Sequence, residues 1–243
     1  MKSVLFDSRS ANSSRVTGWE RYSKEIAMRV AGKFEHFQVL LTDLKADNLK
    51  QRIASDFISM PRIGGSFDLI HFPTYPPITD RYNSKLLIYH LHDLTWWRFP
   101  STASRLGKTY YKRLATKYLE GSDVITTGTE TIKNELEDFF GIQNDRVKVI
   151  PPGVKICNCI PNSYIPKRPY LLYVGTIEPR KNLKLLIDAY ENSGASRWID
   201  LKLAGRFGWG VDLPLGVDAL GTVTDEQLHS LYSNCYAVIQ PSI

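Results

Sequence analysis

Two adjacent cations, Arg180 and Lys181, follow a short apolar stretch that is expected to end as a strand at Gly175. A helix is expected to begin at Asn182, directly after them. Cations at the start of a helix oppose its dipole, so they do not serve helix stability. They fit a site in which an anion such as a diphosphate lies beside them. Solvated surface charge is the alternative.

A second polar group follows another expected strand. His90, His92 and Asp93 come at the end of the apolar run that begins at Lys85. Alternation would point both imidazoles to the same side if the strand continued. Such a group could bind a metal or a polar substrate, whereas a hydrogen-bonded structural histidine is the alternative for each. Metal is disfavoured because the remaining histidines are scattered along the chain, at His36, His71 and His229.

The helix expected to open at Thr17 and Gly18 presents backbone N–H groups and the positive end of its dipole. Gly18 would allow an anion to approach the backbone closely. A plain helix cap is the alternative. The dinucleotide fingerprint Gly-x-Gly-x-x-Gly does not follow the first strand, and the phosphate-binding P-loop motif is also missing. An NAD-dependent oxidoreductase is therefore disfavoured.

The elements that must position these residues alternate between short apolar runs and amphipathic stretches. This pattern predicts βαβ units and an α/β fold with parallel sheets. We expect strands at 3–6, 37–41, 68–71, 85–90, 123–126, 147–150, 170–174, 199–204 and 236–239. We expect helices at 17–30, 101–118, 127–140, 182–191 and 224–233, with a capping box formed by Thr127 and Glu130.

The composition is that of an ordinary globular protein. The 243 residues include 31 Lys and Arg against 25 Asp and Glu, and 43% are hydrophobic, which excludes disordered and collagen-like chains. No apolar run approaches the roughly 18 residues of a membrane span, and the start is too short for a secretory signal. The three cysteines, Cys157, Cys159 and Cys235, favour reduced thiols over a disulfide framework or zinc. We therefore predict a cytoplasmic protein.

The expected helix over 101–118 carries five cations and no acid before Glu120. They are Arg105, Lys108, Lys112, Arg113 and Lys117. This stripe predicts peripheral contact with an anionic membrane, at the inner face, while a solvated basic surface is the alternative. No nucleic-acid-binding motif accompanies it, so nucleic acid is not an expected partner.

A Pro-rich stretch over 151–169 divides the chain and is predicted to be a linker. We expect an acceptor-side domain with the linker over 1–166 and a second domain over 167–243. The second domain stops just after an expected buried strand. This indicates either a small companion domain or a chain truncated inside its second domain, with an uncovered sheet and low stability.

Several segments, in order along essentially the whole chain, resemble the family 4 glycosyltransferases. They include His-Asp-Leu-Thr at 92–95, Gly-Thr-Ile-Glu-Pro-Arg-Lys-Asn at 175–182, Ala-Gly-Arg-Phe-Gly-Trp at 204–209 and Gly-Thr-Val-Thr-Asp-Glu at 221–226. The segments 127–136 and 149–154 fit as well. The similarity is greatest to bacterial mannosyltransferase-like members that build surface polysaccharides.

The resemblance implies a GT-B fold, with two Rossmann-like domains. It implies retaining transfer of a hexose from a nucleotide-diphosphate sugar to a glycan or lipid-linked acceptor, with no metal and no cofactor. Mannose is the first candidate for the hexose. His92 would be catalytic and would face the reacting centre. The resemblance places donor binding at Gly18, Thr176, Arg180, Lys181, Gly205 and Val223. It places acceptor binding at Arg21, Tyr22 and Asp93.

This chain departs from the family pattern in two places. A Gly-rich loop and a pair of glutamates would follow Pro241-Ser242, but the sequence stops at Ile243. The resemblance therefore predicts a second domain that is incomplete, and a catalytically inactive remnant acting as a binding module is the alternative. At the first helix, Trp19 and Glu20 stand where the family more often has Ile and Gly. A carboxylate there opposes phosphate binding unless a capping role turns it away.

Overall fold

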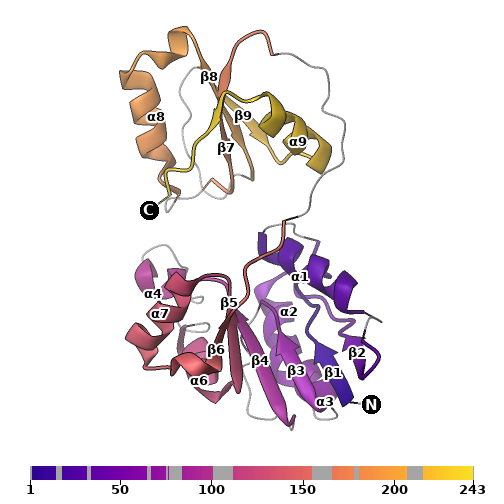
Figure 1. Ribbon diagram of the computed structural model, residues 1–243. Coiled ribbons are helices and arrows are strands. Elements are labelled where there is room, and N and C mark those ends of the chain that lie inside the picture. The colour runs from indigo at the N-terminus through magenta and orange to yellow at the C-terminus, as the bar shows by residue number, and fades with distance from the viewer. Residues whose placement is uncertain are drawn as a thin grey trace. The chain divides into compact units, whose positions relative to one another are not determined.

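The computed structural model describes residues 2–14, 18–31, 34–64, 67–74, 76, 84–100, 112–154, 166–177, 181–206 and 216–242. The chain divides into two compact units, Met1–Gly153 and Val154–Ile243 (Figure 1). This division falls within the Pro-rich stretch in which the sequence predicts a linker. Residues 151–154 and 166–169 form neither helix nor strand.

Unit 1 is built on a six-stranded parallel sheet in the order β2-β1-β3-β4-β5-β6. The order reverses beside β1, because β2 lies on one side of it and β3 on the other. The strands are β1 (Lys2–Phe6), β2 (Phe37–Leu41), β3 (Leu69–Phe72), β4 (Leu86–Leu91), β5 (Val124–Thr127) and β6 (Val147–Val149). All six lie at the predicted places, and the prediction of a parallel α/β architecture is confirmed.

Helices connect these strands, as parallel pairing requires. They are α1 (Gly18–Val30), α2 (Leu49–Ala54), α3 (Met60–Gly64), α4 (Thr95–Arg98), α6 (Arg113–Gly121) and α7 (Glu130–Phe140), together with the π-helix η1 (Ser55–Ser59) and the 3-10 turn η4 (Asn144–Arg146). The segments α2, η1 and α3 follow one another without a break. The predicted stretch over 101–111 lies outside the described residues.

The core of unit 1 lies between the sheet and its helices. Strand residues alternate across the sheet, so the apolar side chains of neighbouring strands meet on one face. Helix residues such as Leu119 and Leu136 pack onto that face. Its fully buried strand members are Leu5, Ile70, Phe72, Tyr89, Leu91, Ile125 and Val147. Because this core fixes the strands, it also fixes the positions at which their carboxyl ends leave the sheet.

Unit 2 holds a four-stranded parallel sheet in the order β10-β7-β8-β9. Its strands are β7 (Tyr170–Val174), β8 (Asp200–Ala204), β9 (Val217–Gly221) and β10 (Ala237–Val238), and its helices are α8 (Leu183–Asn192) and α9 (Asp225–Asn234), with the 3-10 turn η6 (Ala195–Arg197). Figure 1 shows α8 and α9 on opposite sides of this sheet.

The two faces of the unit 2 sheet have separate cores. Tyr173 and Leu203 pack with Leu183, Leu186 and Tyr190 of α8. These three and Ile187, the predicted inward residues of the helix, are all buried. Tyr170 and Leu172 pack with α9 through Leu231. Each face thus has a covering helix, so the expectation of an uncovered sheet is wrong in that respect. The edge strand β10 is the least covered, since Val238 is half-exposed.

The predicted capping box of Thr127 and Glu130 is wrong. Thr127 still belongs to β5, where its carbonyl accepts from Ile150 N–H at 2.7 Å. The cap of α7 is Thr129, whose hydroxyl accepts from the Ile132 N–H at 3.3 Å. The sequence places a threonine at both positions, and only the length of the ladder with β6 decides between them.

Candidate functional site

In unit 1, the candidate residues gather where β1, β3 and β4 end. Because the strands are parallel, their carboxyl ends share one edge of the sheet, and the strand order reverses between β1 and β3. Ligands of open α/β sheets bind at such a reversal. The loop after β1 bonds directly to the end of β3, since Asp7 N–H donates to the His71 carbonyl at 2.9 Å and the Ser10 and Thr74 hydroxyls lie 2.8 Å apart.

Two histidines and two aromatic residues of α1 form a stacked cluster at this edge. The rings of His90 and His92 lie 4.5 Å apart, so the predicted placement on one side is confirmed. Trp19 stacks on His92 with centroids 5.3 Å apart, and Tyr22 stacks on His90 at 4.7 Å. Tyr22 also meets His92 edge-on at 4.9 Å. The cluster therefore joins the first turns of α1 to the end of β4.

The tautomer of His92 follows from its hydrogen bond. Its Nε2 lies 3.0 Å from the Pro73 carbonyl oxygen, which can only accept, so Nε2 carries the proton. Burial lowers the pKa of His92, although Pro73, Asp93 and Glu20 oppose the shift. A neutral ring with its proton on Nε2 leaves Nδ1 as a hydrogen-bond acceptor. Nδ1 can accept a hydrogen bond from a hydroxyl group, while the ring stays uncharged near neutral pH.

His90 is held neutral more firmly. Burial, followed by the neighbouring His92 and His71, lowers its pKa to about 3. Its Nδ1 lies 2.9 Å from the Thr126 hydroxyl and 3.3 Å from the Tyr22 hydroxyl. His90 is fully buried. It therefore supports the position of Tyr22 and His92, which are only partly buried.

The other predicted residues of unit 1 lie close by in the chain. Gly18 is the first residue of α1, is exposed, and has open space where a side chain would project. Arg21 is exposed on the same helix. The carboxylate of Asp93 accepts from the Thr95 N–H at 3.0 Å and so holds the start of α4. Thr17, at which the helix is expected to open, lies outside the described residues.

In unit 2, three strand ends are joined through glycine backbone. Gly175 N–H donates to the Ala204 carbonyl at 2.9 Å, and Gly205 N–H donates to the Gly221 carbonyl at 2.8 Å. Gly205 has a φ of +149°, and a Cβ there would lie 1.9 Å from the Gly175 carbonyl oxygen. No residue with a side chain fits this approach. It brings together the ends of β7, β8 and β9.

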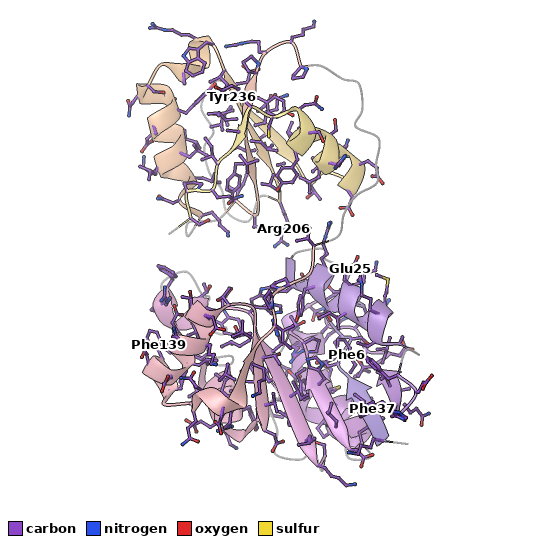
Figure 2. The ribbon with its side chains drawn as sticks, in the orientation of Figure 1. Phe6, Glu25, Phe37, Phe139, Arg206 and Tyr236 are labelled. Atoms are coloured by element: carbon purple, nitrogen blue, oxygen red, sulfur yellow. The ribbon has the colours of Figure 1, made fainter. Side chains whose placement is uncertain are left out.

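The predicted donor-side residues Thr176, Gly205 and Val223 lie at or just beyond these strand ends. The Thr176 carbonyl accepts from the Tyr173 hydroxyl at 3.1 Å. Val223 packs its side chain into the core under α9. Arg206, labelled in Figure 2 directly after β8, accepts at its carbonyl from Ile177 N–H at 2.9 Å. The structure therefore gathers these residues at one edge of the unit 2 sheet.

The two predicted cations stand before α8. Lys181 is half-buried and lies just before Asn182, the first cap residue, which has a left-handed φ of 52° and makes no side-chain cap bond. Lys181 thus lies beside N–H groups at the start of α8 that no cap side chain satisfies. Arg180 lies outside the described residues, so its role stays a prediction.

Sequence reasoning missed a buried ionic network in unit 1. The Arg9 guanidinium bonds both oxygens of Asp7, each at 2.7 Å, and bonds Asp56 at 2.6 Å. Arg52 bonds the other oxygen of Asp56 at 2.6 Å. At most 2% of any of these side chains is exposed. The available signal was the i, i+4 spacing of Arg52 and Asp56 on a helix, and Asp-x-Arg directly after a strand.

This network fixes the ionisation of its members. Burial alone would raise the pKa of Asp7, but Arg9 beside it, together with Arg52, holds that pKa below its ordinary value. Burial would likewise lower the pKa of Arg9, whereas Asp7 and Asp56 raise it. The charged state is therefore favoured in both partners. The consequence is a rigid loop after β1, anchored to α2 and η1 rather than to solvent.

The described ranges also bear on membrane-spanning and metal-binding sites. Within those ranges no helix is long and apolar enough to cross a membrane. Over the same part of the chain, no three His, Cys, Asp or Glu residues gather in a way that could hold a metal ion. Cys157 and Cys159 lie outside it, and Cys235 is a free thiol.

Known proteins resemble this chain both in sequence and in fold. Residues 41–156 match the model of Glycosyltransferase Family 4. The chain is 25% identical over 186 residues to O-antigen chain mannosyltransferase B of Escherichia coli. The matched region covers 62% of this chain and 45% of that protein. The chain thus spans less than half the length of this relative.

Solved structures resemble the chain over nearly all of its length. A glycosyltransferase from Rickettsia africae is 16% identical with a TM-score of 0.56, covering 100% of this chain and 73% of its own. The S. aureus MnaA-UDP co-structure is 10% identical with a TM-score of 0.57, covering 98% and 73%. At these identities the structures speak for the fold alone. Together with the two parallel sheets, they show that the chain has the GT-B fold, and the match over residues 41–156 shows that this part of the chain is similar to glycosyltransferase family 4.

Proposed function

We propose that this chain takes part in retaining transfer of a hexose from a nucleotide-diphosphate sugar to a glycan or lipid-linked acceptor of a surface polysaccharide. Mannose is the first candidate for the hexose. The observation that carries the proposal is the neutral His92, with its proton directed to Pro73 and its Nδ1 left as an acceptor at the strand-order reversal. Such a nitrogen can accept a hydrogen bond from a sugar hydroxyl. The 25% identity to an O-antigen mannosyltransferase supports mannose as the first sugar to test.

The donor half of the proposal rests on unit 2. Lys181 and Arg180 would hold the diphosphate, and Thr176 and Gly205 would line its place at the strand ends. Val223 would contact the base through its backbone, because its side chain is committed to the core. A structural neighbour of this chain was solved with UDP, which supports a nucleotide as ligand.

Unit 1 would supply the remaining contacts. Gly18 would lie against the phosphates or the transferred sugar, and Arg21, Tyr22 and Asp93 would contact the acceptor. As charge grows on the leaving diphosphate, the cations and the helix N-termini stabilise it. The leaving phosphate would accept the proton of the acceptor hydroxyl, so His92 positions the sugar and does not act as the base.

Donor binding is the first test. The 243-residue chain is titrated with GDP-mannose and then with other nucleotide hexoses by calorimetry. Lys181→Glu should weaken donor binding at least about tenfold, because it places like charge beside a diphosphate. Lys184→Glu is the matched control, since Lys184 is exposed in the first turn of α8 and, among the described residues, forms an ion pair with Asp188. Equal affinity of the Lys181→Glu variant and the parent would contradict the assignment.

The role of His92 needs a separate measurement. His92→Ala should reduce sugar transfer, or release of sugar to water, while leaving affinity for the bare nucleotide unchanged. Thr95→Ala is the control, because it changes the same loop without removing the imidazole. A loss of nucleotide affinity in His92→Ala equal to the loss of transfer would instead place His92 outside the sugar site.

A further inference from the structure

The continuous helical segment α2-η1-α3, over 49–64, carries charge inside and apolar side chains outside along its first turns. Arg52 and Asp56 are almost fully buried, at 2% and 1% exposure. Ile53, Phe57 and Ile58, between and beside them, are 37%, 47% and 51% exposed. A surface helix normally buries its apolar stripe. This one does the reverse.

The ionic network of unit 1 explains why the apolar residues stay outside. Arg52 bonds Asp56, and Asp56 bonds Arg9, which lies in the loop after β1. Turning Ile53 or Phe57 inward would take Asp56 away from Arg9 and leave Asp7 as the remaining carboxylate beside the buried Arg9. The outward direction of the apolar side chains is therefore built into the fold of unit 1.

The inversion is confined to the first turns. Met60 N–H donates to the Ser55 carbonyl, an i to i−5 bond that adds one residue to the turn. After it, Met60 is fully buried and Ile63 packs on the core in the ordinary way. Helices with such π turns are frequent at functional positions. Here the turn separates an outward apolar row from a normal core contact.

The exposed side of this segment has charge of one sign. We name its members, Lys50, Ile53, Ala54, Phe57, Ile58 and Arg62, the outer face; all six are exposed. Lys50 and Arg62 stand at its two ends, and the one acid of the segment, Asp56, is buried with Arg52 and Arg9. An apolar row with a cation at each end is complementary to an anionic lipid surface, where acyl chains lie beneath phosphate.

We propose that the outer face binds the surface of an anionic phospholipid bilayer. Phe57 and Ile58 enter the headgroup layer, and the long side chains of Lys50 and Arg62 extend along it to the lipid phosphates. This places membrane contact on α2, η1 and the Arg62 side chain of α3, and not on the basic stripe predicted over 101–118. The proposal does not depend on the transfer activity, because it concerns residues outside both candidate sites.

Vesicle flotation tests the proposal with the 243-residue chain. Vesicles of phosphatidylcholine are compared with and without about one-third phosphatidylglycerol. We expect the chain to float with the anionic vesicles, and the bound fraction to fall as salt is added. The double variant F57S/I58S should lower the partition coefficient at least about tenfold, since two large apolar groups no longer leave water. K50E/R62E should lower it for anionic vesicles alone.

Matched controls locate the effect. Phe139→Ser removes a 53% exposed phenylalanine on the outer side of α7 (Figure 2), and Leu185→Ser removes a 57% exposed leucine on α8. Both should bind as the parent does. The proposal is overturned if the parent does not bind anionic vesicles, or if F57S/I58S binds equally well. Loss of binding in Lys112→Glu alone would return the contact to the basic stripe.

A second copy of the chain is the competing occupant of the outer face. If F57S/I58S abolishes a concentration-dependent dimer while the parent ignores vesicles, self-association replaces the lipid proposal. Donor titration of F57S/I58S runs in parallel and should match the parent. Failure of vesicle binding is thereby separated from failure of the proposed sugar transfer.

Discussion

The loops that follow the first strands of the two sheets are held by different forces. After β1, the loop is held by side chains. These are the Arg9 network, the Ser8 hydroxyl, which donates to the Thr42 carbonyl at 2.7 Å, and the Asn12 amide, which donates to the same carbonyl at 2.8 Å. After β7, the loop is held by backbone contact, because Gly175 and Gly205 pack directly against each other. One edge thus depends on ionisation and the other on the absence of a Cβ.

The largest expected effect breaks the glycine-held edge. Gly205→Ala would place a Cβ 1.9 Å from the Gly175 carbonyl, between two backbones that cannot turn aside. We expect about 5 kcal/mol of lost stability in unit 2, in the range kept for severe backbone strain. Urea unfolding, with hydrogen exchange read separately on peptides of each unit, measures it.

Gly221→Ala is the matched control for that change. Gly221 also has a positive φ, +67°, but nothing lies within 4 Å of its Cβ position. It should cost only the left-handed backbone penalty of about 1–2 kcal/mol. Similar losses at the two glycines would mean that close approach contributes nothing at Gly205.

The second effect breaks the side-chain-held edge. Arg9→Met removes the cation that bonds Asp7 and Asp56 and leaves buried carboxylates undercompensated. We expect about 4 kcal/mol of lost stability, confined to unit 1. Adding Asp7→Asn should recover part of it, because the stranded charge is then gone. The same urea and exchange measurements apply.

An exposed ion pair provides the comparison for Arg9. Arg29→Met breaks the pair between Arg29 and Glu25 on the surface of α1, and should cost less than about 1 kcal/mol. If Arg9→Met is equally mild, the network does not hold the loop after β1.

The third expected effect is a loss of unit 1 stability at acidic pH. Burial lowers the pKa of His90 to about 3 and that of His71 to about 4, with Asp7 opposing the shift at His71. Below about pH 6.5 the unfolded chain takes up protons that these folded rings do not, so stability falls as pH decreases. Between pH 7 and 5, each ring should cost unit 1 roughly 2 kcal/mol.

Unfolding in urea at pH 7, 6 and 5 checks the acid effect. Asp7, whose pKa is lowered, keeps its contribution above about pH 4 and loses it only at lower pH, so it does not disturb this window. His71→Gln should flatten the pH dependence of unit 1 by about half. A stability of unit 1 that stays constant from pH 7 to 5 would contradict the buried neutral state of both rings.

Local patterns predicted most of the helices and strands, because the spacing of apolar residues and the positions of glycines can be seen within each short segment. The strands of both sheets except β9, and the inward residues of α8, followed from period alone. The placement of His90 and His92 on one side followed from alternation. In the candidate site, the strand-end positions of His92, Thr176 and Gly205 needed no knowledge beyond which runs were strands.

What could not be predicted depends on contacts distant in sequence. The segment over 49–64 has no apolar period that fits burial, because its inner side meets Arg9, more than forty residues earlier. Strand β9 is short and only partly buried, so its own residues give little signal. The proton position on His92 depends on Pro73, which comes from another strand end.

The smallest effect concerns the start of α7, where the sequence offers two threonines. Thr129 accepts from Ile132 N–H, so Thr129→Ala should cost about 1 kcal/mol, as a lost helix cap does. Thr127 is fully buried in β5, and its hydroxyl has no hydrogen-bond partner among the residues that the structure describes. Thr127→Val keeps the shape and removes that hydroxyl, so it should be neutral or slightly stabilising. Thr224→Ala, at the capping box of α9, is the matched change in unit 2 and should also cost about 1 kcal/mol. Urea midpoints of the three variants rank them. A larger loss for Thr127→Val than for Thr129→Ala would return the cap to Thr127 and shorten β5 by one residue.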